Sequence, residues 1–107
     1  MNFTGKTAIS TGAASGMGLL FAQNWAELGG NVVMCDVNEE TLKTFVEELN
    51  SKKKGKAIGV VCDVRDYHQV CAARDKAVEI FGSIDIMCNF AGGTAVRMQK
   101  VDHTQYP

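Results

Sequence analysis

Four short apolar runs alternate with three longer stretches of helical periodicity, and this alternation limits the possible folds more than any other feature. The runs are rich in β-branched residues and occupy residues 7–11, 31–35, 57–62 and 84–88. Parallel neighbouring strands need a connection long enough to return across the sheet, and a helix supplies that connection. The alternation therefore predicts an α/β fold with a doubly wound parallel sheet and three helices.

The three expected helices have recognisable ends and apolar faces. Asn38 and Asp66 stand where N-cap residues would begin the second and third helices. Glycines at 29–30, 55 and 82 would end the helices, and the lysines at 52–54 would form a solvated helix end. Spacings of three and four residues predict the buried stripes. These are Met17, Phe21, Trp25 and Leu28; then Leu42, Phe45, Val46 and Leu49; then Val70, Ala73, Ala77 and Phe81.

A glycine-rich loop, STGAASGMG, joins the first strand to the first helix at residues 10–18. Glycine adopts positive φ without a Cβ clash and lets a ligand approach the backbone closely. The free N–H groups and the dipole at the start of a helix suit a diphosphate. The alternative is a purely structural turn, which would account for Gly12 and for Gly18. Asp36 makes the indication of a nucleotide site more specific. It ends the second strand, where a dinucleotide fold places an acid for the ribose hydroxyls.

The glycine spacing, Thr11-Gly12-x-x-x-Gly16-x-Gly18, resembles the nucleotide loop of the short-chain dehydrogenase/reductase family. Asp63-Val64 matches the family's adenine-contacting pair. Residues 89–92 match its Asn-Asn-Ala-Gly motif, with Phe90 in place of the second Asn. The resemblance implies a Rossmann-type sheet, and Asn89 as its brace. The implied cofactor-binding residues are Thr11, Gly12, Ser15, Gly16, Met17, Gly18, Asp36, Val37, Asp63, Val64, Asn89, Ala91 and Gly92.

Crossover handedness predicts how the sheet is assembled. Right-handed crossovers place the first two helices on one face and the third helix on the other, with strand order 3-2-1-4. Strand four would then be an open edge. Because such an edge favours pairing with another chain, we expect a homo-oligomer or a poorly soluble chain.

Asp36 predicts NAD rather than NADP as the cofactor. Its carboxylate can accept hydrogen bonds from the NAD ribose but would repel the 2′-phosphate of NADP. That repulsion reaches ~4 kcal/mol at ~4 Å in an effective dielectric of about 20. NADP-preferring relatives usually carry a basic residue where this chain has Ser15 or Val37. Arg65 is the one nearby cation that could alter the preference.

No catalytic residue is recognisable. The family uses a Tyr-x-x-x-Lys motif, in which neighbouring positive charge lowers a tyrosine pKa of about 10. Tyr67 is followed at the fourth position by Cys71, and Tyr106 only by Pro107. We therefore expect residues 1–92 to be the NAD-binding half of a longer oxidoreductase, with 93–107 leading toward its next helix. The alternative is a non-catalytic nucleotide-binding half-domain.

Composition excludes several other classes of function. A net charge of −1 gives no reason to expect nucleic acid or an anionic membrane as a partner. No apolar run is long enough to span a bilayer and the first ten residues lack a signal-peptide pattern, so we expect a cytoplasmic protein. The four cysteines form no C-x-x-C pair and are expected to be core thiols rather than metal ligands. Cys35 and Cys62 could lie on neighbouring strands.

Overall fold

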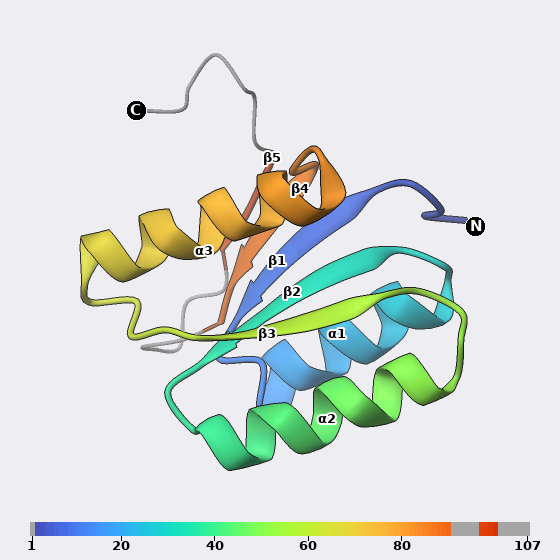
Figure 1. The fold of residues 1–107 in the computed structure, drawn as a ribbon, viewed down its shortest axis with the longest axis horizontal. Coiled ribbons are helices and arrows are strands. Elements are labelled where there is room, and N and C mark those ends of the chain that lie inside the picture. The colour runs from blue at the N-terminus through green and yellow to red at the C-terminus, as the bar shows by residue number, and fades with distance from the viewer. Residues whose placement is uncertain (1, 91–96, 101–107) are drawn as a thin grey trace.

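A five-stranded sheet forms the centre of the computed structural model, which describes residues 2–90 and the backbone of residues 97–100 (Figure 1). The strands are β1 (Thr7–Thr11), β2 (Asn31–Asp36), β3 (Ala57–Val61), β4 (Ile86–Asn89) and β5 (Arg97–Lys100). Their order is β3-β2-β1-β4-β5, and the first four strands run parallel. The predicted order 3-2-1-4 is confirmed.

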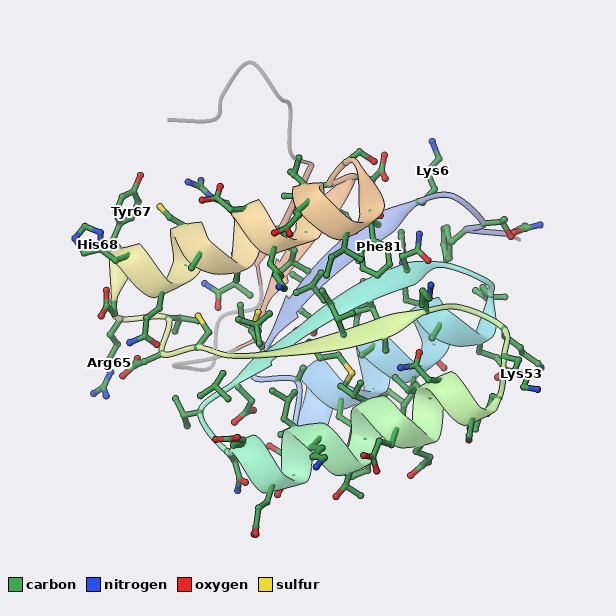
Figure 2. All side chains as sticks on the ribbon, in the orientation of Figure 1. Lys6, Lys53, Arg65, Tyr67, His68 and Phe81 are labelled. Atoms are coloured by element: carbon green, nitrogen blue, oxygen red, sulfur yellow. The ribbon has the colours of Figure 1, made fainter. Side chains whose placement is uncertain are left out.

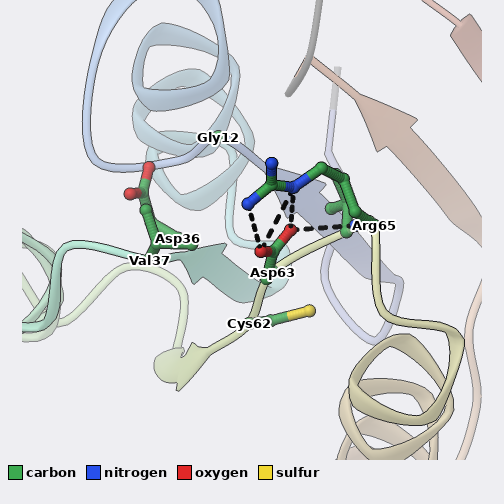
Figure 3. A pocket seen from close by; sticks show the side chains of 7 residues that line it. Gly12, Asp36, Val37, Cys62, Asp63 and Arg65 are labelled. Carbon is green, nitrogen blue, oxygen red and sulfur yellow. Dashed lines mark hydrogen bonds and ion pairs between the residues drawn. The ribbon is translucent and has the colours of Figure 1, made fainter.

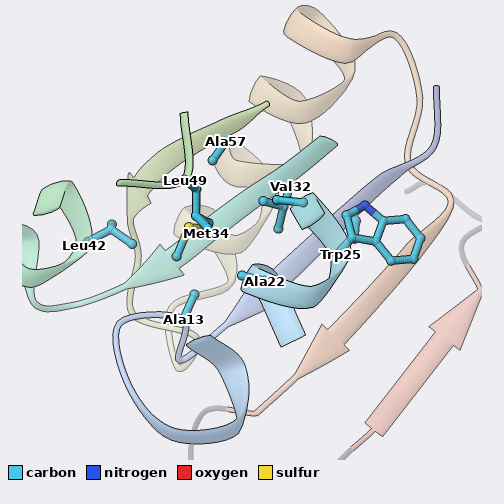
Figure 4. Packing of buried hydrophobic residues seen from close by; sticks show 10 residues of the cluster. Ala13, Ala22, Trp25, Val32, Met34, Leu42, Leu49 and Ala57 are labelled. Carbon is cyan, nitrogen blue, oxygen red and sulfur yellow. The ribbon is translucent and has the colours of Figure 1, made fainter. Parts of the chain in front are cut away.

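Three helices cover the two faces of the sheet as crossover handedness predicts. Helices α1 (Gly16–Glu27) and α2 (Glu39–Ser51) lie together on one face, and α3 (Tyr67–Phe81) lies on the other (Figure 1). Each face has its own apolar core. The core under α1 and α2 includes Val32, Met34 and Leu42 (Figure 4), and the core under α3 includes Ile9, Val33 and Ile84.

The predicted N-caps are present. The Asn38 side chain accepts a hydrogen bond from the Thr41 N–H at 3.1 Å, and Asp66 accepts one from the His68 N–H at 2.9 Å. Gly82, with φ of 85°, ends α3 in the left-handed conformation. The predicted stripes of α2 and α3 are buried or partly buried against the sheet.

The predicted end of the second helix is wrong by several residues. Helix α2 ends at Ser51, and Lys53 already has a left-handed φ of 56°. Gly55 therefore does not close the helix. A Cβ atom there would lie 2.1 Å from the Gly30 carbonyl oxygen, so Gly55 is needed for close contact between two loops. The lysines at 52–54 are exposed as expected, as Figure 2 shows for Lys53, and Lys54 forms an ion pair with Glu27 of α1.

The predicted apolar stripe of the first helix is partly wrong. The buried residues of α1 are Gly18, Ala22, Trp25 and Ala26, whereas Met17 is 61% exposed and Leu28 37% exposed. Small side chains bring the helix close to the sheet, so the face with glycine and alanine is the buried one. Trp25 fills the remaining space (Figure 4), and its ring stacks on Phe3 with centroids 4.0 Å apart.

The expectation that strand four is an open edge is also wrong. Strand β5 pairs antiparallel with β4, with Ile86 opposite Lys100 and Asn89 opposite Arg97. This pairing supplies partners for the backbone N–H and C=O groups that β4 would otherwise present to solvent. The segment expected to lead toward a helix thus contains a strand. Its sequence, Arg-Met-Gln-Lys, lacks the apolar alternation that indicates one.

Candidate nucleotide-binding site

The carboxyl ends of the four parallel strands meet at one edge of the sheet. Thr11 ends β1, Asp36 ends β2 and Asn89 ends β4, and Asp63 follows β3 after one intervening residue. Strand β1 lies between β2 on one side and β4 on the other, so the order of the strands reverses its direction at β1. Ligands of open α/β sheets bind at such a switch point, outside the carboxyl ends of the strands. The fold therefore brings the predicted residues to a suitable edge.

The glycine loop places the start of α1 at this edge. Gly12 and Gly16 have φ values of 63° and 57°, in the left-handed region that favours glycine. Ser15 is the N-cap, but its side chain makes no capping hydrogen bond. The first amide N–H groups of a helix lack acceptors within the helix and carry its positive dipole end. This helix start is thus suited to a negatively charged group.

Gly16 and Gly18 have different reasons to be glycine. A Cβ atom at Gly16 would meet nothing within 4 Å, so this residue borders open space. A Cβ atom at Gly18 would lie 2.3 Å from the Gly12 carbonyl oxygen. The Ser10 hydroxyl also donates to the Gly18 carbonyl at 3.0 Å, which ties the first turn of α1 to β1. The structural interpretation therefore accounts for Gly18, while Gly16 leaves room for a ligand.

Asp36 has a second role that the sequence did not reveal. Its carboxylate accepts hydrogen bonds from the Ala14 N–H and the Asn38 N–H, each at 3.0 Å. These contacts join the glycine loop to the turn before α2. An ionised carboxylate offers about four lone-pair sites, so two remain for a ligand. Asp36 can thus support the loop and still accept hydrogen bonds from a ribose.

A pocket of about 350 Å³ opens beside Asp36 (Figure 3). Five of the predicted residues line it, namely Gly12, Asp36, Val37, Asp63 and Val64. Two further lining residues, Cys62 and Arg65, were not predicted as site residues. Val37 is 65% exposed, an apolar surface that a flat aromatic ring can cover. The pocket is of a size and lining that suit a nucleoside.

Asp63 and Arg65 form an ion pair at the wall of this pocket (Figure 3). The Arg65 side chain donates from Nε to Oδ1 at 3.0 Å and from a terminal nitrogen to Oδ2 at 2.8 Å. The Arg65 backbone N–H donates to Oδ1 as well, at 3.0 Å. These hydrogen bonds favour the ionised carboxylate and lower the pKa of Asp63 to about 2.

Thr11 and Asn89 connect β1 to β4. The Thr11 hydroxyl donates to the Asn89 side-chain oxygen at 2.7 Å and accepts from the Phe90 N–H at 3.1 Å. Asn89 therefore joins the two strands, as expected of a brace. The Phe90 ring lies 5.9 Å from that of Phe21 on α1, so the residue that replaces the family's second Asn makes an aromatic contact instead.

The remaining predicted residues are placed differently. Ser15 and Met17 are exposed at the start of α1 and do not line the pocket. Ala91 and Gly92 lie outside the described residues. In the part of the chain that the structure describes, no group of three or more acidic, His or Cys side chains could hold a metal ion. Tyr67 is 60% exposed at the start of α3, and Tyr106 is not among the described residues.

The cysteines are free thiols, three of them buried. Cys35 ends β2 one residue before Asp36, and Cys62 follows β3 directly. Burial, and secondarily the nearby Cys62 thiol, raises the pKa of Cys35 to about 12. A thiol with so high a pKa is a poor nucleophile, because only the thiolate reacts. The prediction of core thiols agrees with the burial of Cys35, Cys62 and Cys88, whereas Cys71 is only half-buried.

Comparison with known proteins identifies the family. The short chain dehydrogenase model matches residues 6–106, nearly the whole chain. The chain belongs to the short-chain dehydrogenase family. It is 40% identical to D-threitol dehydrogenase of Mycolicibacterium smegmatis, over 82% of this chain and 34% of that protein. It is 34% identical to 7alpha-hydroxysteroid dehydrogenase of Escherichia coli K12, over 87% of this chain and 36% of that protein.

Solved structures of family members have the same fold. L-Sorbose reductase from Gluconobacter frateurii, complexed with NADPH and L-sorbose, matches with a TM-score of 0.81 and 30% identity, over 89% of this chain and 36% of that one. A short-chain dehydrogenase/reductase from Burkholderia phymatum in complex with NAD matches with a TM-score of 0.76 and 40% identity, over 81% and 31%. The chain thus spans about a third of the length of these relatives.

Dinucleotide binding is a property of these neighbours, and both NADPH and NAD occur among them. The comparisons therefore support a dinucleotide cofactor. Among the described helices, none has the length and apolar character needed to cross a membrane.

Proposed function

We propose that this protein is an NAD-dependent oxidoreductase, and that the residues described above form its cofactor-binding part. The observation that carries the proposal is the pairing of an open, left-handed Gly16 at the start of α1 with a pocket bordered by Asp36. The first feature leaves space for a diphosphate beside amide groups, and the second offers a carboxylate and a nucleoside-sized pocket.

Each group in the site has a distinct part in this proposal. The amides at the start of α1 bind the diphosphate, and Asp36 accepts hydrogen bonds from the adenosine ribose. Val37 and the pair Asp63-Val64 hold the adenine ring. When bound, the nicotinamide supplies or accepts the hydride that is exchanged with an alcohol or ketone. Thr11 and Asn89 hold β1 and β4 in register, so the site keeps its shape.

NAD is the proposed cofactor because of charge. Asp36 borders the position that the 2′-phosphate of NADP would occupy, and Ser15 and Val37 supply no positive charge there. The repulsion is up to ~4 kcal/mol at ~4 Å in an effective dielectric of about 20. We expect NADH to bind more tightly than NADPH.

A second candidate is a nucleotide-binding protein without catalysis of its own. The observation in its favour is that Tyr67 is followed at the fourth position by Cys71 and not by the lysine of a Tyr-x-x-x-Lys motif. Under this alternative the site binds the dinucleotide, but no alcohol or ketone is turned over.

Titration calorimetry with NADH tests the proposed site. Gly16→Asp adds a negative charge where the diphosphate would lie, and it should abolish binding. Gly16→Asn is the matched control, because Asn and Asp both tolerate the left-handed conformation and differ mainly in charge. Equal NADH affinity of the Asp variant and the unmodified chain would refute the loop assignment.

Two further expectations belong to the proposal. Free thiols suit a reducing compartment such as the cytoplasm. The expectation of a homo-oligomer is no longer supported by an open β4 edge, because β5 pairs with β4. What still supports it is exposed apolar surface, including Leu20 at 56% and Ile80 at 43% exposure. Light scattering on the purified chain would show a single monomeric mass if this expectation is wrong.

A further inference from the structure

Three charged side chains line the pocket, two of them anionic and one cationic. Asp36 and Asp63 are anions, and of the described residues lining the pocket only Arg65 is a cation. The 2′-phosphate of NADP carries about two negative charges near neutrality. Among these three side chains, only Arg65 can attract that phosphate.

Arg65 is already engaged by Asp63. Its guanidinium makes contacts of 2.8, 3.0 and 3.3 Å to the two carboxylate oxygens, a forked geometry that suits arginine. Figure 3 shows the Arg65 side chain directed at Asp63, while the Asp36 carboxylate points elsewhere. The low pKa of Asp63 keeps this partner ionised at every working pH.

The guanidinium is nevertheless within reach of solvent and of a ligand. The Arg65 side chain is 88% exposed, and the hydrogen bonds and ion pair described for it all go to Asp63. Carboxylate and phosphate are both bound bidentately by arginine, so they compete for the same donors. Asp63 occupies Nε and one terminal nitrogen, so a 2′-phosphate could bind this edge of the guanidinium only by displacing Asp63.

We propose that Asp63 sets the cofactor preference by holding Arg65 away from the 2′-phosphate of NADP, an inference that rests on the proposed function. Asp63 thereby adds to the effect of Asp36. The Asp36 carboxylate repels the phosphate directly, and the Asp63 carboxylate binds the cation that would attract the phosphate. Asp63 is a specificity-determining residue in addition to any contact that it makes with adenine.

The test is a double-mutant cycle on the ratio of two dissociation constants, that for NADPH divided by that for NADH. The ratio cancels effects on adenine binding that both nucleotides share. It is measured by calorimetry for the unmodified chain, Asp63→Asn, Arg65→Ala and the double variant. Asp63→Asn should lower the ratio by about three- to fivefold, the fold-change that corresponds to an exposed ion pair. In the Arg65→Ala background the same substitution should leave the ratio unchanged.

The two possible causes of a lower ratio separate in this cycle. If Asp63 acted only through its own charge, its removal would lower the ratio equally with and without Arg65, and the inference would be overturned. Glu39→Gln is a charge-matched control at the start of α2, outside the pocket lining, and it should shift the ratio much less. Asp63→Ser replaces Asp63→Asn if circular dichroism shows the latter unfolded.

Failure of the inference differs from failure of the proposed function. A folded chain that binds neither nucleotide overturns both. A chain that binds NADH and NADPH, but whose ratio responds to Asp63→Asn independently of Arg65, overturns only the role of Asp63. A response to Asp63→Asn that disappears with Arg65→Ala supports the proposal.

Discussion

Gly18 lies so close to Gly12 that a Cβ atom on Gly18 would come within 2.3 Å of the Gly12 carbonyl oxygen and 2.8 Å of the Thr11 oxygen. The first turn of α1 therefore packs directly on the backbone at the end of β1. This contact fixes where the helix begins, and so where its free amide groups lie relative to Asp36.

Gly18→Ala should destabilise the protein. The clash is with backbone atoms, which cannot rotate away as a flexible side chain would. We expect a loss of roughly 1–3 kcal/mol, as for overpacking of a well-packed interior. Urea unfolding followed by circular dichroism measures it. Gly5→Asn is the control, since that site has a φ of 81° and open space; equal losses in both variants would contradict the packing role of Gly18.

Local signals made much of this fold predictable. Asn38 and Asp66 were recognisable as helix caps because a cap depends on one side chain and the next three amides. Strand order followed from the handedness of crossovers, which does not depend on side chains. The buried face of α1 was mispredicted because Met17 is apolar, but glycine and alanine allow the closer approach to the sheet.

The site was predicted in its residue types but not in its contacts. The glycine spacing and Asp36 indicated a dinucleotide edge. Nothing in the sequence showed that Asp36 also accepts the Ala14 N–H, or that Arg65 folds back onto Asp63. Such contacts depend on rotamers and on segments far apart in the chain. Strand β5 was missed for a related reason. It supplies hydrogen-bond partners to the backbone of β4, and its own sequence has no apolar alternation that would indicate a strand.

Breaking the contact between Thr11 and Asn89 should loosen β1 from β4. Thr11→Val removes a hydroxyl that both donates to Asn89 and accepts from Phe90, leaving two partly buried groups unsatisfied. The expected cost is about 1–3 kcal/mol. Thr11→Ser keeps the hydroxyl and should cost less. In a cycle with Asn89→Ala, unfolding free energies that simply add would show that the two side chains do not interact.

Asp36→Asn should shift the cofactor preference toward NADP. The amide keeps one oxygen, which can still accept the Ala14 N–H and support the glycine loop, while the Asn38 N–H loses its acceptor and the charge is lost. Removing up to ~4 kcal/mol of repulsion from the 2′-phosphate should tighten NADPH binding by about tenfold or more, while NADH binding weakens. Calorimetric titration of both nucleotides measures the change. Unchanged NADPH affinity would place the phosphate away from Asp36.

Cys35 should make the protein sensitive to alkaline pH. Burial raises the pKa of its thiol from 9.0 to about 12, so the folded state holds this proton more tightly than the unfolded state does. The resulting stability is fully present below pH 9 and is lost as pH rises toward 12. Cys35→Val has no such proton, so its stability should fall less over that range. Parallel pH dependence of the two proteins in urea unfolding would contradict the assignment.

The contribution of Asp63 to stability should be lost at acid pH, whereas that of Cys35 is lost at alkaline pH. Hydrogen bonds from the Arg65 side chain and backbone lower the pKa of its carboxyl from 3.8 to about 2. The folded state therefore holds this proton less tightly than the unfolded state, and the contribution is present above pH 3.8 and lost as pH falls toward 2. Carboxyl carbon NMR should show Asp63 titrating well below an ordinary aspartate. Arg65→Ala leaves at most the backbone hydrogen bond, so the pKa should return toward 3.8. An unchanged low pKa in that variant would mean that Arg65 does not hold this carboxylate in solution, and the cation would then be free for a ligand phosphate.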